Sequence, residues 1–224
     1  MIFQRKSCRS FTGKAVDGEM LEKILSFKPK ALYPQLKVRM DIVSRDQVKC
    51  LCPWTTPQLI AIYSEEADGH LENIGFLFQQ MDLYLQTLGL GVCWLGMGRM
   101  NPKATAQVEG MKFVIMLAFG HPKGDSLRHD GKGFKRKSLL QITDTPDVRL
   151  EPARLAPSAV NSQPWYFTHG EDAIHVHCSK RGSRLDAGIA LAHLYVANET
   201  SFRFFRAENV PEVPGFGYIG SVNL

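Results

Sequence analysis

The chain has 224 residues and a formal net charge of +5, with 44% hydrophobic and 22% charged residues. This composition is that of ordinary globular proteins, so it excludes a globally disordered chain and permits one large domain or two small lobes. No run of about eighteen apolar residues occurs, so no membrane-spanning helix is expected. The basic balance points to an anionic partner, and a phosphorylated cofactor satisfies it as well as a polynucleotide does. No basic run is long enough for a nucleic-acid arm.

The cysteine pattern favours a reducing location. The number is odd and the spacing matches neither a disulfide framework nor a zinc site. The first nine residues are charged and lack a secretory apolar stretch, so a cytoplasmic protein is expected. The five cysteines are Cys8, Cys50, Cys52, Cys93 and Cys178.

The spacing of apolar residues predicts six elements before residue 123. They are a helix over 17–27, strands over 36–43 and 58–63, a long helix over 71–88, a short helix over 101–108 and a strand over 113–119. The long helix is the clearest, since its apolar positions step by three and four and Gly89 follows it. The strand over 113–119 is almost wholly apolar, which predicts burial on both faces.

After a polar, basic connection over 123–137, a similar pattern occurs in a shorter form. The predicted elements are a helix start over 146–155, a strand over 174–178, a helix over 185–198, a strand over 202–207 and a Gly/Pro-rich tail from 210. The repeated order predicts two related lobes, residues 1–140 and 141–224. A single domain with an irregular second half is the alternative.

Four segments suggest the binding of a phosphorylated planar ligand. Arg5 and Arg9 are four residues apart, and a guanidinium group can donate two N–H bonds to one phosphate. Residues 156–165, APSAVNSQPW, offer the amides of Asn161 and Gln163, which match a heterocycle with carbonyl and N–H groups. Residues 88–96, LGLGVCWLG, contain three glycines that permit close backbone approach. The basic run 135–137 could contact a phosphate. Each segment alone is equally compatible with a solvated terminus, a polar turn, a helix cap or a loop.

Together and in this order, the segments resemble the nitroreductase family. The likeness adds Phe-Gly-His-Pro at 119–122, and PSAVNSQPW is its most distinctive string. It implies an α+β, nitroreductase-like fold with a central, mostly antiparallel sheet flanked by helices. It also implies non-covalently bound FMN, with NADH or NADPH as reductant.

One departure from the usual family pattern concerns the position of that string. In ordinary members it follows the N-terminal arginine motif by a few tens of residues, where this chain has Lys28–Pro34 instead. Ordinary members are dimers whose subunits share each flavin site. The chain is therefore similar to the single-chain pseudo-dimer branch first seen in a thermophile, in which one polypeptide supplies both halves of a site. A monomer is expected, and a homodimer is possible.

The resemblance implies a set of cofactor-binding residues and leaves the catalytic chemistry to the flavin. The phosphate and ribityl chain would be held by the opening motif, the ring by the glycine motif, and the polar edge by the later string. The residues implied are Arg5, Lys6, Ser7, Arg9, Trp94, Leu95, Gly96, Arg136, Pro157, Ser158, Asn161 and Gln163.

The sequence thus predicts an FMN-dependent oxidoreductase that passes electrons from NAD(P)H to a small acceptor, such as a nitroaromatic or quinone-like compound, by a ping-pong mechanism. Two alternatives remain: a flavin-binding carrier or sensor without turnover, and a basic module for RNA or another polyanion. No metal site is expected. His175 and His177 share a strand face without a third ligand, and Cys50 and Cys52 likewise lack partners.

Overall fold

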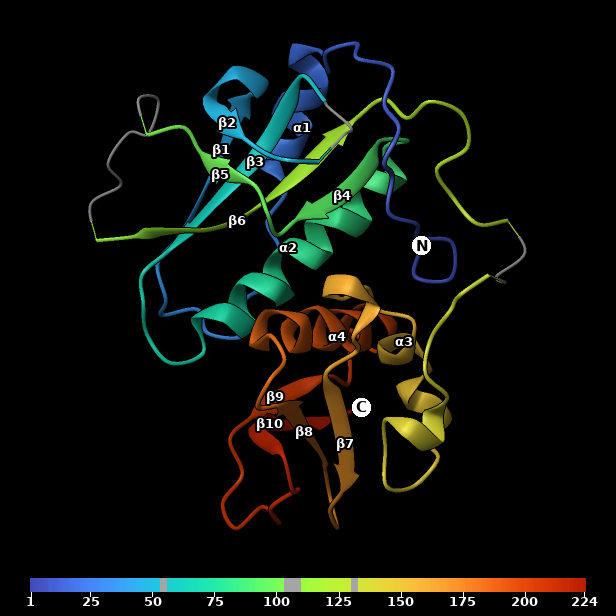
Figure 1. Cartoon of the computed structure of the whole chain (residues 1–224). Helices are drawn as coiled ribbons and strands as arrows, with labels where there is room; N and C mark the ends of the chain where they lie inside the picture. The colour runs from blue at the N-terminus through green and yellow to red at the C-terminus, as the bar shows by residue number, and fades with distance from the viewer. Residues whose placement is uncertain (53–55, 103–109, 130–132) are drawn as a thin grey trace.

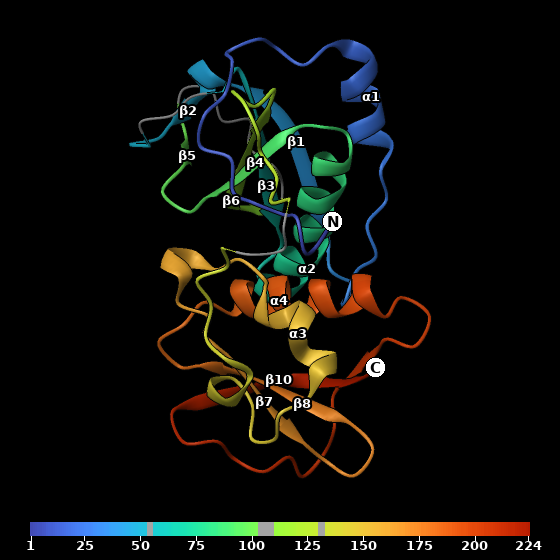
Figure 2. The same ribbon diagram turned by 90° about the vertical axis from the view of Figure 1, so that its right-hand side faces the viewer.

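The computed structural model describes residues 1–52, 56–102, 110–129 and 133–224. Two four-stranded sheets lie at opposite ends of the molecule, and the helices α2 and α4 pack against each other between them (Figures 1 and 2). The core cluster that fills this middle layer includes side chains from both sheets and both helices. The mixture of helices and antiparallel sheets agrees with the predicted α+β class.

The first sheet has the strand order β1-β3-β6-β4, and neighbouring strands are antiparallel. The elements of this half are α1 (Gly18–Ser26), β1 (Val38–Ser44), η1 (Arg45–Gln47), β2 (Val48–Lys49), β3 (Gln58–Ser64), α2 (His70–Thr87), β4 (Gly91–Leu95), β5 (Arg99–Met100) and β6 (Lys112–Gly120). Five predicted elements are confirmed, with each end within two residues of the prediction. The short helix expected over 101–108 falls mostly on 103–109, outside the described residues.

The second sheet has the strand order β7-β8-β10-β9 and is also antiparallel. The elements of this half are η2 (Leu139–Gln141), η3 (Val148–Leu150), α3 (Glu151–Arg154), η4 (Ala159–Asn161), β7 (Trp165–His169), β8 (Ile174–Ser179), α4 (Arg184–Ala197), β9 (Arg203–Phe205) and β10 (Phe216–Asn223). The predicted helix over 185–198 and the strands over 174–178 and 202–207 are confirmed, the last in a shorter form.

The Gly/Pro-rich tail predicted from residue 210 is wrong for its last part, because β10 forms there and pairs with both β8 and β9. Its glycines, which weaken a strand pattern in sequence, serve packing here. A Cβ on Gly220 would lie 2.4 Å from the ring of Phe204. The pairing of β10 with β8 also shifts register between Tyr218 and Gly220. Strand β7, which begins at Trp165, was not predicted either.

Glycine backbones meet where α2 and α4 pack together. A Cβ on Gly75 would lie 2.0 Å from the carbonyl oxygen of Leu185, and a Cβ on Gly188 would lie 2.1 Å from that of Glu72. Real side chains do not approach backbone atoms so closely, so any other residue here would push the helices apart. The spacing between the two sheets therefore depends on this crossing.

The N-terminal segment is tied to α2 and β4. Arg5 and Asp82 form a buried ion pair, with Arg5 Nη2 2.8 Å from Asp82 Oδ2. Gln86 Nε2 also donates to Asp82, and its Oε1 accepts from the Lys6 backbone N–H at 3.3 Å. The Cys8 N–H donates to the Val92 carbonyl at 2.8 Å. These bonds fix the path of residues 7–9 relative to α2 and β4.

We expect Gly188→Ala to destabilise the fold by at least about 2 kcal/mol, because the added methyl group must separate α2 from α4. Urea denaturation measures the change. Gly18→Ala is the matched control, since a Cβ there meets nothing within 4 Å. Equal unfolding midpoints for the two variants would contradict the close crossing.

We expect Asp82→Ala to lower the free energy of unfolding by about 3–5 kcal/mol, because it leaves the buried Arg5 charge without its partner. Thermal or urea denaturation again provides the measurement. Glu19→Ala, which removes the exposed partner of Lys23, is the control and should leave the unfolding midpoint unchanged. A similar midpoint for both variants would show that the Arg5–Asp82 pair does not hold the segment.

Candidate functional site

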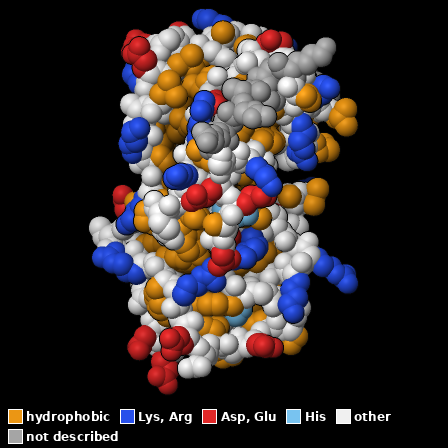
Figure 3. Space-filling view, turned by 90° about the vertical axis from the view of Figure 1, so that its left-hand side faces the viewer, with side chains coloured by type: hydrophobic (Ala, Val, Ile, Leu, Met, Phe, Trp, Pro, Cys, Tyr) orange, Lys and Arg blue, Asp and Glu red, His pale blue; other side chains and the backbone are white. Residues whose placement is uncertain are grey.

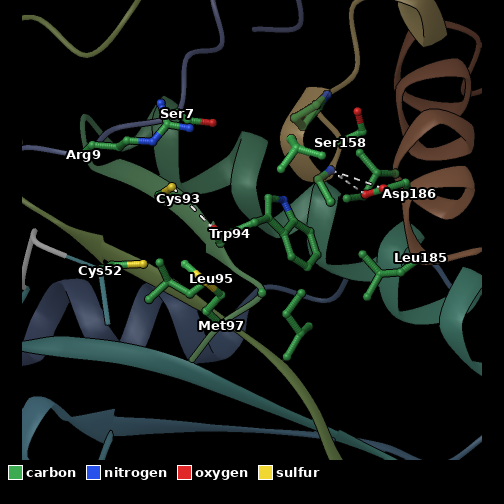
Figure 4. A pocket seen from close by; sticks show the side chains of 16 residues that line it. Ser7, Arg9, Cys52, Cys93, Trp94, Leu95, Met97, Ser158, Leu185 and Asp186 are labelled. Carbon is green, nitrogen blue, oxygen red and sulfur yellow. Dashed lines mark hydrogen bonds between the residues drawn. The ribbon is translucent and has the colours of Figure 1, made fainter. Parts of the chain in front are cut away.

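A cavity of about 310 Å³ lies where the opening segment, β4 and the start of the second half of the chain meet. Figure 4 shows Arg9 and Ser7 on one side of it, Ser158, Asp186 and Leu185 on the other, and Trp94 between them. Its lining consists of Ser7, Arg9, Cys52, Cys93, Trp94, Leu95, Gly96, Met97, Ile115, Pro157, Ser158, Ala159, Val160, Leu185, Asp186 and Ile189.

Seven of the twelve residues predicted from the sequence line this cavity. They come from all three principal motifs, although these are separated by up to about 150 positions in the chain. The seven are Ser7, Arg9, Trp94, Leu95, Gly96, Pro157 and Ser158. The fold therefore brings together the segments that the sequence marked.

The other five do not line the cavity, and most of their polar groups bond to the protein itself. Arg5 pairs with Asp82 and also donates from Nη1 to Ser7 Oγ at 3.2 Å. Lys6 is exposed. Gln163 is buried, accepts from the Lys137 N–H at 2.8 Å and donates to the Arg154 carbonyl at 3.2 Å.

Arg136 and Asn161 contact each other. Arg136 Nη1 donates to Asn161 Oδ1, and Asn161 Nδ2 donates to the Lys135 carbonyl at 2.6 Å. Arg136 Nε also donates to the Ala156 carbonyl at 3.0 Å. Burial lowers the pKa of Arg136 to about 10. The basic run 135–137 is thus bonded to the later string.

Residues 158–163 form a turn with unusual backbone angles, which we call the 158–163 turn. Val160, Asn161 and Gln163 have φ values of 46°, 58° and 45°. For a β-branched valine this left-handed conformation is rare and costly, and such strain gathers at functional sites. Ser158 Oγ accepts from the Gln163 N–H at 2.9 Å, and Lys137 Nζ donates to the Gln163 carbonyl at 2.9 Å.

A chain of hydrogen bonds orients Trp94. Its indole N–H donates to Gln79 Oε1 at 3.0 Å, so the Gln79 amide nitrogen faces His193 Nε2 at 3.1 Å. That ring nitrogen must accept, which leaves the His193 proton on Nδ1, 3.0 Å from the Pro152 carbonyl. Burial lowers the pKa of His193 to about 3, so the ring is neutral. Trp94 on β4 is thus positioned through α2 and α4.

Asp186, which lies in the first turn of α4, was not predicted from the sequence. Both its oxygens accept from the Ala159 N–H at 3.2 Å. Burial raises the pKa of this carboxyl group to about 6. One acidic residue opening an otherwise apolar helix, LDAGIALAHL, was a usable indication. Nothing in the sequence indicated that the apolar residues Met97, Ile115 and Ile189 line the cavity.

The cysteines and histidines form no metal site among the residues that the structure describes. Burial raises the pKa of Cys8, Cys52 and Cys93, the last to about 11, so these thiols are neutral. In the same described part of the chain, no helix is long and apolar enough to cross a bilayer. Trp165, the last residue of the later string, is buried in the core.

The arrangement suits a planar ligand with an anionic tail. Arg9 and the Ser7 hydroxyl offer donors at one end, and Trp94 with the aliphatic lining offers apolar surface in the middle. The volume lies near the lower end of the range of small-molecule sites. Held by the 158–163 turn on one side and β4 on the other, such a ligand would contact both halves of the chain.

Comparisons with known proteins identify a family model and solved structures that the chain resembles. A family model described as "Putative TM nitroreductase" matches residues 1–198. Among solved structures, a protein described as a putative nitroreductase from Thermotoga maritima is 21% identical, with a TM-score of 0.66 over 99% of this chain and 90% of that chain. No curated protein matches the sequence.

Two further structures resemble a smaller part of the chain. An FMN-dependent nitroreductase from Clostridium difficile is 18% identical over 61% of this chain and 96% of that chain, with a TM-score of 0.47. A protein described as a putative NADH dehydrogenase/NAD(P)H nitroreductase from Parabacteroides distasonis is 15% identical over 63% of this chain and 93% of that chain, with a TM-score of 0.48. The Thermotoga structure shows a similar fold, and because the family model spans most of the sequence, the chain belongs to this nitroreductase family.

Proposed function

We propose that the protein is an FMN-dependent oxidoreductase that carries electrons from NADH or NADPH to a small acceptor, such as a nitroaromatic or quinone-like compound. One observation carries the proposal: Ser7 and Arg9, residues 94–96 and residues 157–158, from both halves of the chain, line one cavity. Family membership supports the flavin. When bound, FMN supplies the hydride chemistry, and the protein supplies position and electrostatics.

The phosphate and ribityl chain belong at the Arg9 end in this proposal. Arg9 and Ser7 face the cavity and can donate to phosphate oxygens. Arg5 acts through Ser7, whose hydroxyl oxygen accepts from it at 3.2 Å. Lys6 lies beside them on the surface and adds positive charge.

The ring belongs against β4 and the 158–163 turn. Trp94, Leu95 and Gly96 offer one surface, and Pro157 and Ser158 offer the other. Arg136, Asn161 and Gln163 serve indirectly in this arrangement, since their bonds hold the strained turn in place. The neutral His193 and Gln79 keep Trp94 from rotating.

In this proposal the electron donor and the acceptor enter the same cavity in turn, so the nicotinamide leaves before the acceptor enters, which is a ping-pong order. The exposed apolar side chains of Met97 and Val160 at its edge suit small aromatic molecules. Polynucleotide binding is disfavoured on the face shown in Figure 3, where acidic and basic side chains are interspersed.

The proposal treats residues 1–140 and 141–224 as two related lobes, the second replacing the partner subunit of an ordinary dimeric family member. Each lobe contains one four-stranded antiparallel sheet and one long helix. The glycine motif occurs in the first lobe alone. A monomer with one flavin per chain follows.

We expect the purified protein to show a flavin absorbance spectrum, with about one FMN released per chain, that bleaches on addition of NADH or NADPH. Spectroscopy with released flavin quantified by chromatography tests this. Bleaching with dithionite but neither nicotinamide would favour a carrier or sensor. A protein that takes up no FMN and shifts RNA in a salt-dependent manner would favour the polyanion-binding module.

We expect Arg9→Ala to weaken FMN binding by about 1.5–3 kcal/mol, or roughly ten- to hundredfold, because a charge-assisted bond to the phosphate is lost. Fluorescence titration of the flavin-free protein measures the dissociation constant. Arg39→Ala is the control, because Arg39 lies on β1 and pairs with Asp41. Equal affinities for the two variants would remove Arg9 from the phosphate site.

A further inference from the structure

Three acidic side chains are buried within the described part of the chain, and two of them have a cationic partner. Asp82 pairs with Arg5, and Glu72 accepts from Arg184 Nε at 2.5 Å. Asp186 forms no ion pair with any described residue, although it is only 3% exposed. A buried, uncompensated carboxylate is costly, so its presence in a cavity lining requires an explanation.

The hydrogen bonding of Asp186 is incomplete. One N–H group, that of Ala159, donates to both carboxylate oxygens at 3.2 Å. A carboxylate can accept about four hydrogen bonds. Holding the 158–163 turn therefore uses a small part of its capacity, and a neutral Asn could make the same contact.

The charges around Asp186 do not neutralise it. Cys178 on β8 has a thiol whose pKa is raised to about 12, first by burial and then by the Asp186 and Glu72 charges. Arg184, two residues before Asp186 on α4, pairs with Glu72 and Asp68. Arg9 is the cation of the cavity lining, and it lies on the opposite side of the cavity (Figure 4).

The cavity therefore has opposite charges at its two ends. If the anionic tail of the flavin occupies the Arg9 end and the ring lies against β4 and the 158–163 turn, the electron acceptor enters beside the ring, at the Asp186 end. There an entering molecule meets Trp94, the exposed side chains of Met97 and Val160, and the Asp186 carboxyl group. The surroundings are apolar with one fixed negative charge.

We propose that Asp186 sets the charge class of the acceptor: the site takes neutral or cationic aromatic compounds and rejects those that carry a carboxylate or sulfonate. This inference rests on the proposed function, since it places the flavin phosphate at the Arg9 end. The cause is repulsion between like charges in a site of low dielectric constant, where it is much stronger than in water.

Benzamide and benzoate form a suitable pair of probes, because they have nearly the same shape and differ in charge. We expect isothermal titration calorimetry on the FMN-loaded protein at pH 8 to show at least tenfold tighter binding of benzamide. The preference should fall at pH 5, because the pKa of Asp186 is about 6 and its charge is present above that value and lost below it. Benzoate remains largely ionised at both pH values.

Asp186→Asn should reduce the preference for benzamide at pH 8 by about tenfold and abolish its pH dependence, while the affinity for benzamide changes less than twofold. Asp41→Asn on β1, which also removes one carboxylate, should behave as the unmodified protein does. If Asp186→Asn does not fold, Asp186→Ser takes its place with the same two probes.

Flavin content is measured first, so that the two proposals fail separately. A protein that binds no FMN overturns the proposed function and this inference with it. An FMN-loaded protein whose preference is the same at pH 5 and pH 8, or unchanged by Asp186→Asn, overturns the inference and leaves the function standing.

Discussion

The contact on which the rest of the structure depends is the crossing of α2 and α4 at Gly75 and Gly188. The backbones come so close there that a methyl group on either glycine would overlap a carbonyl oxygen of the other helix. This spacing lets Gln79 on α2 reach His193 on α4, and through that pair it orients Trp94. The cavity exists because the halves of the chain approach this closely.

Much of the fold could be predicted from the sequence, because amphipathic periodicity survives wherever an element buries one face. The helix over 71–88 was found from apolar positions that step by three and four, and the strand over 113–119 was found from its almost unbroken apolar run. Strand β10 was not predicted, because Gly220 has no side chain to contribute to an alternating strand pattern. The same lack of a side chain lets Gly220 pack against the Phe204 ring. Prediction from local sequence patterns fails where a residue's identity is required by contact with a residue distant in the sequence.

The sequence predicted which segments form the site, but it predicted only in part which side chains within them line the cavity. Composition and order indicated which stretches meet, but they could not show which polar groups bond to the protein itself. Arg5 is turned toward Asp82, and the Gln163 side chain holds Lys137 and Arg154. Asp186 went unnoticed because an acidic residue in the first turn of a helix is so common.

The 158–163 turn and Asp186 are joined by a hydrogen bond, and each adds an unfavourable free energy to the folded state: backbone strain in the turn and a buried charge at Asp186. Val160 adopts a backbone conformation that valine disfavours, and its neighbours Ala159 and Asn161 are held by bonds to Asp186 and to Arg136. An uncharged partner at residue 186 could hold the turn equally well. The carboxylate is thus more than the turn requires, and the excess is a negative charge directed at the cavity. The hydrogen bond to the Ala159 N–H holds the turn, and the negative charge of Asp186 discriminates between acceptors.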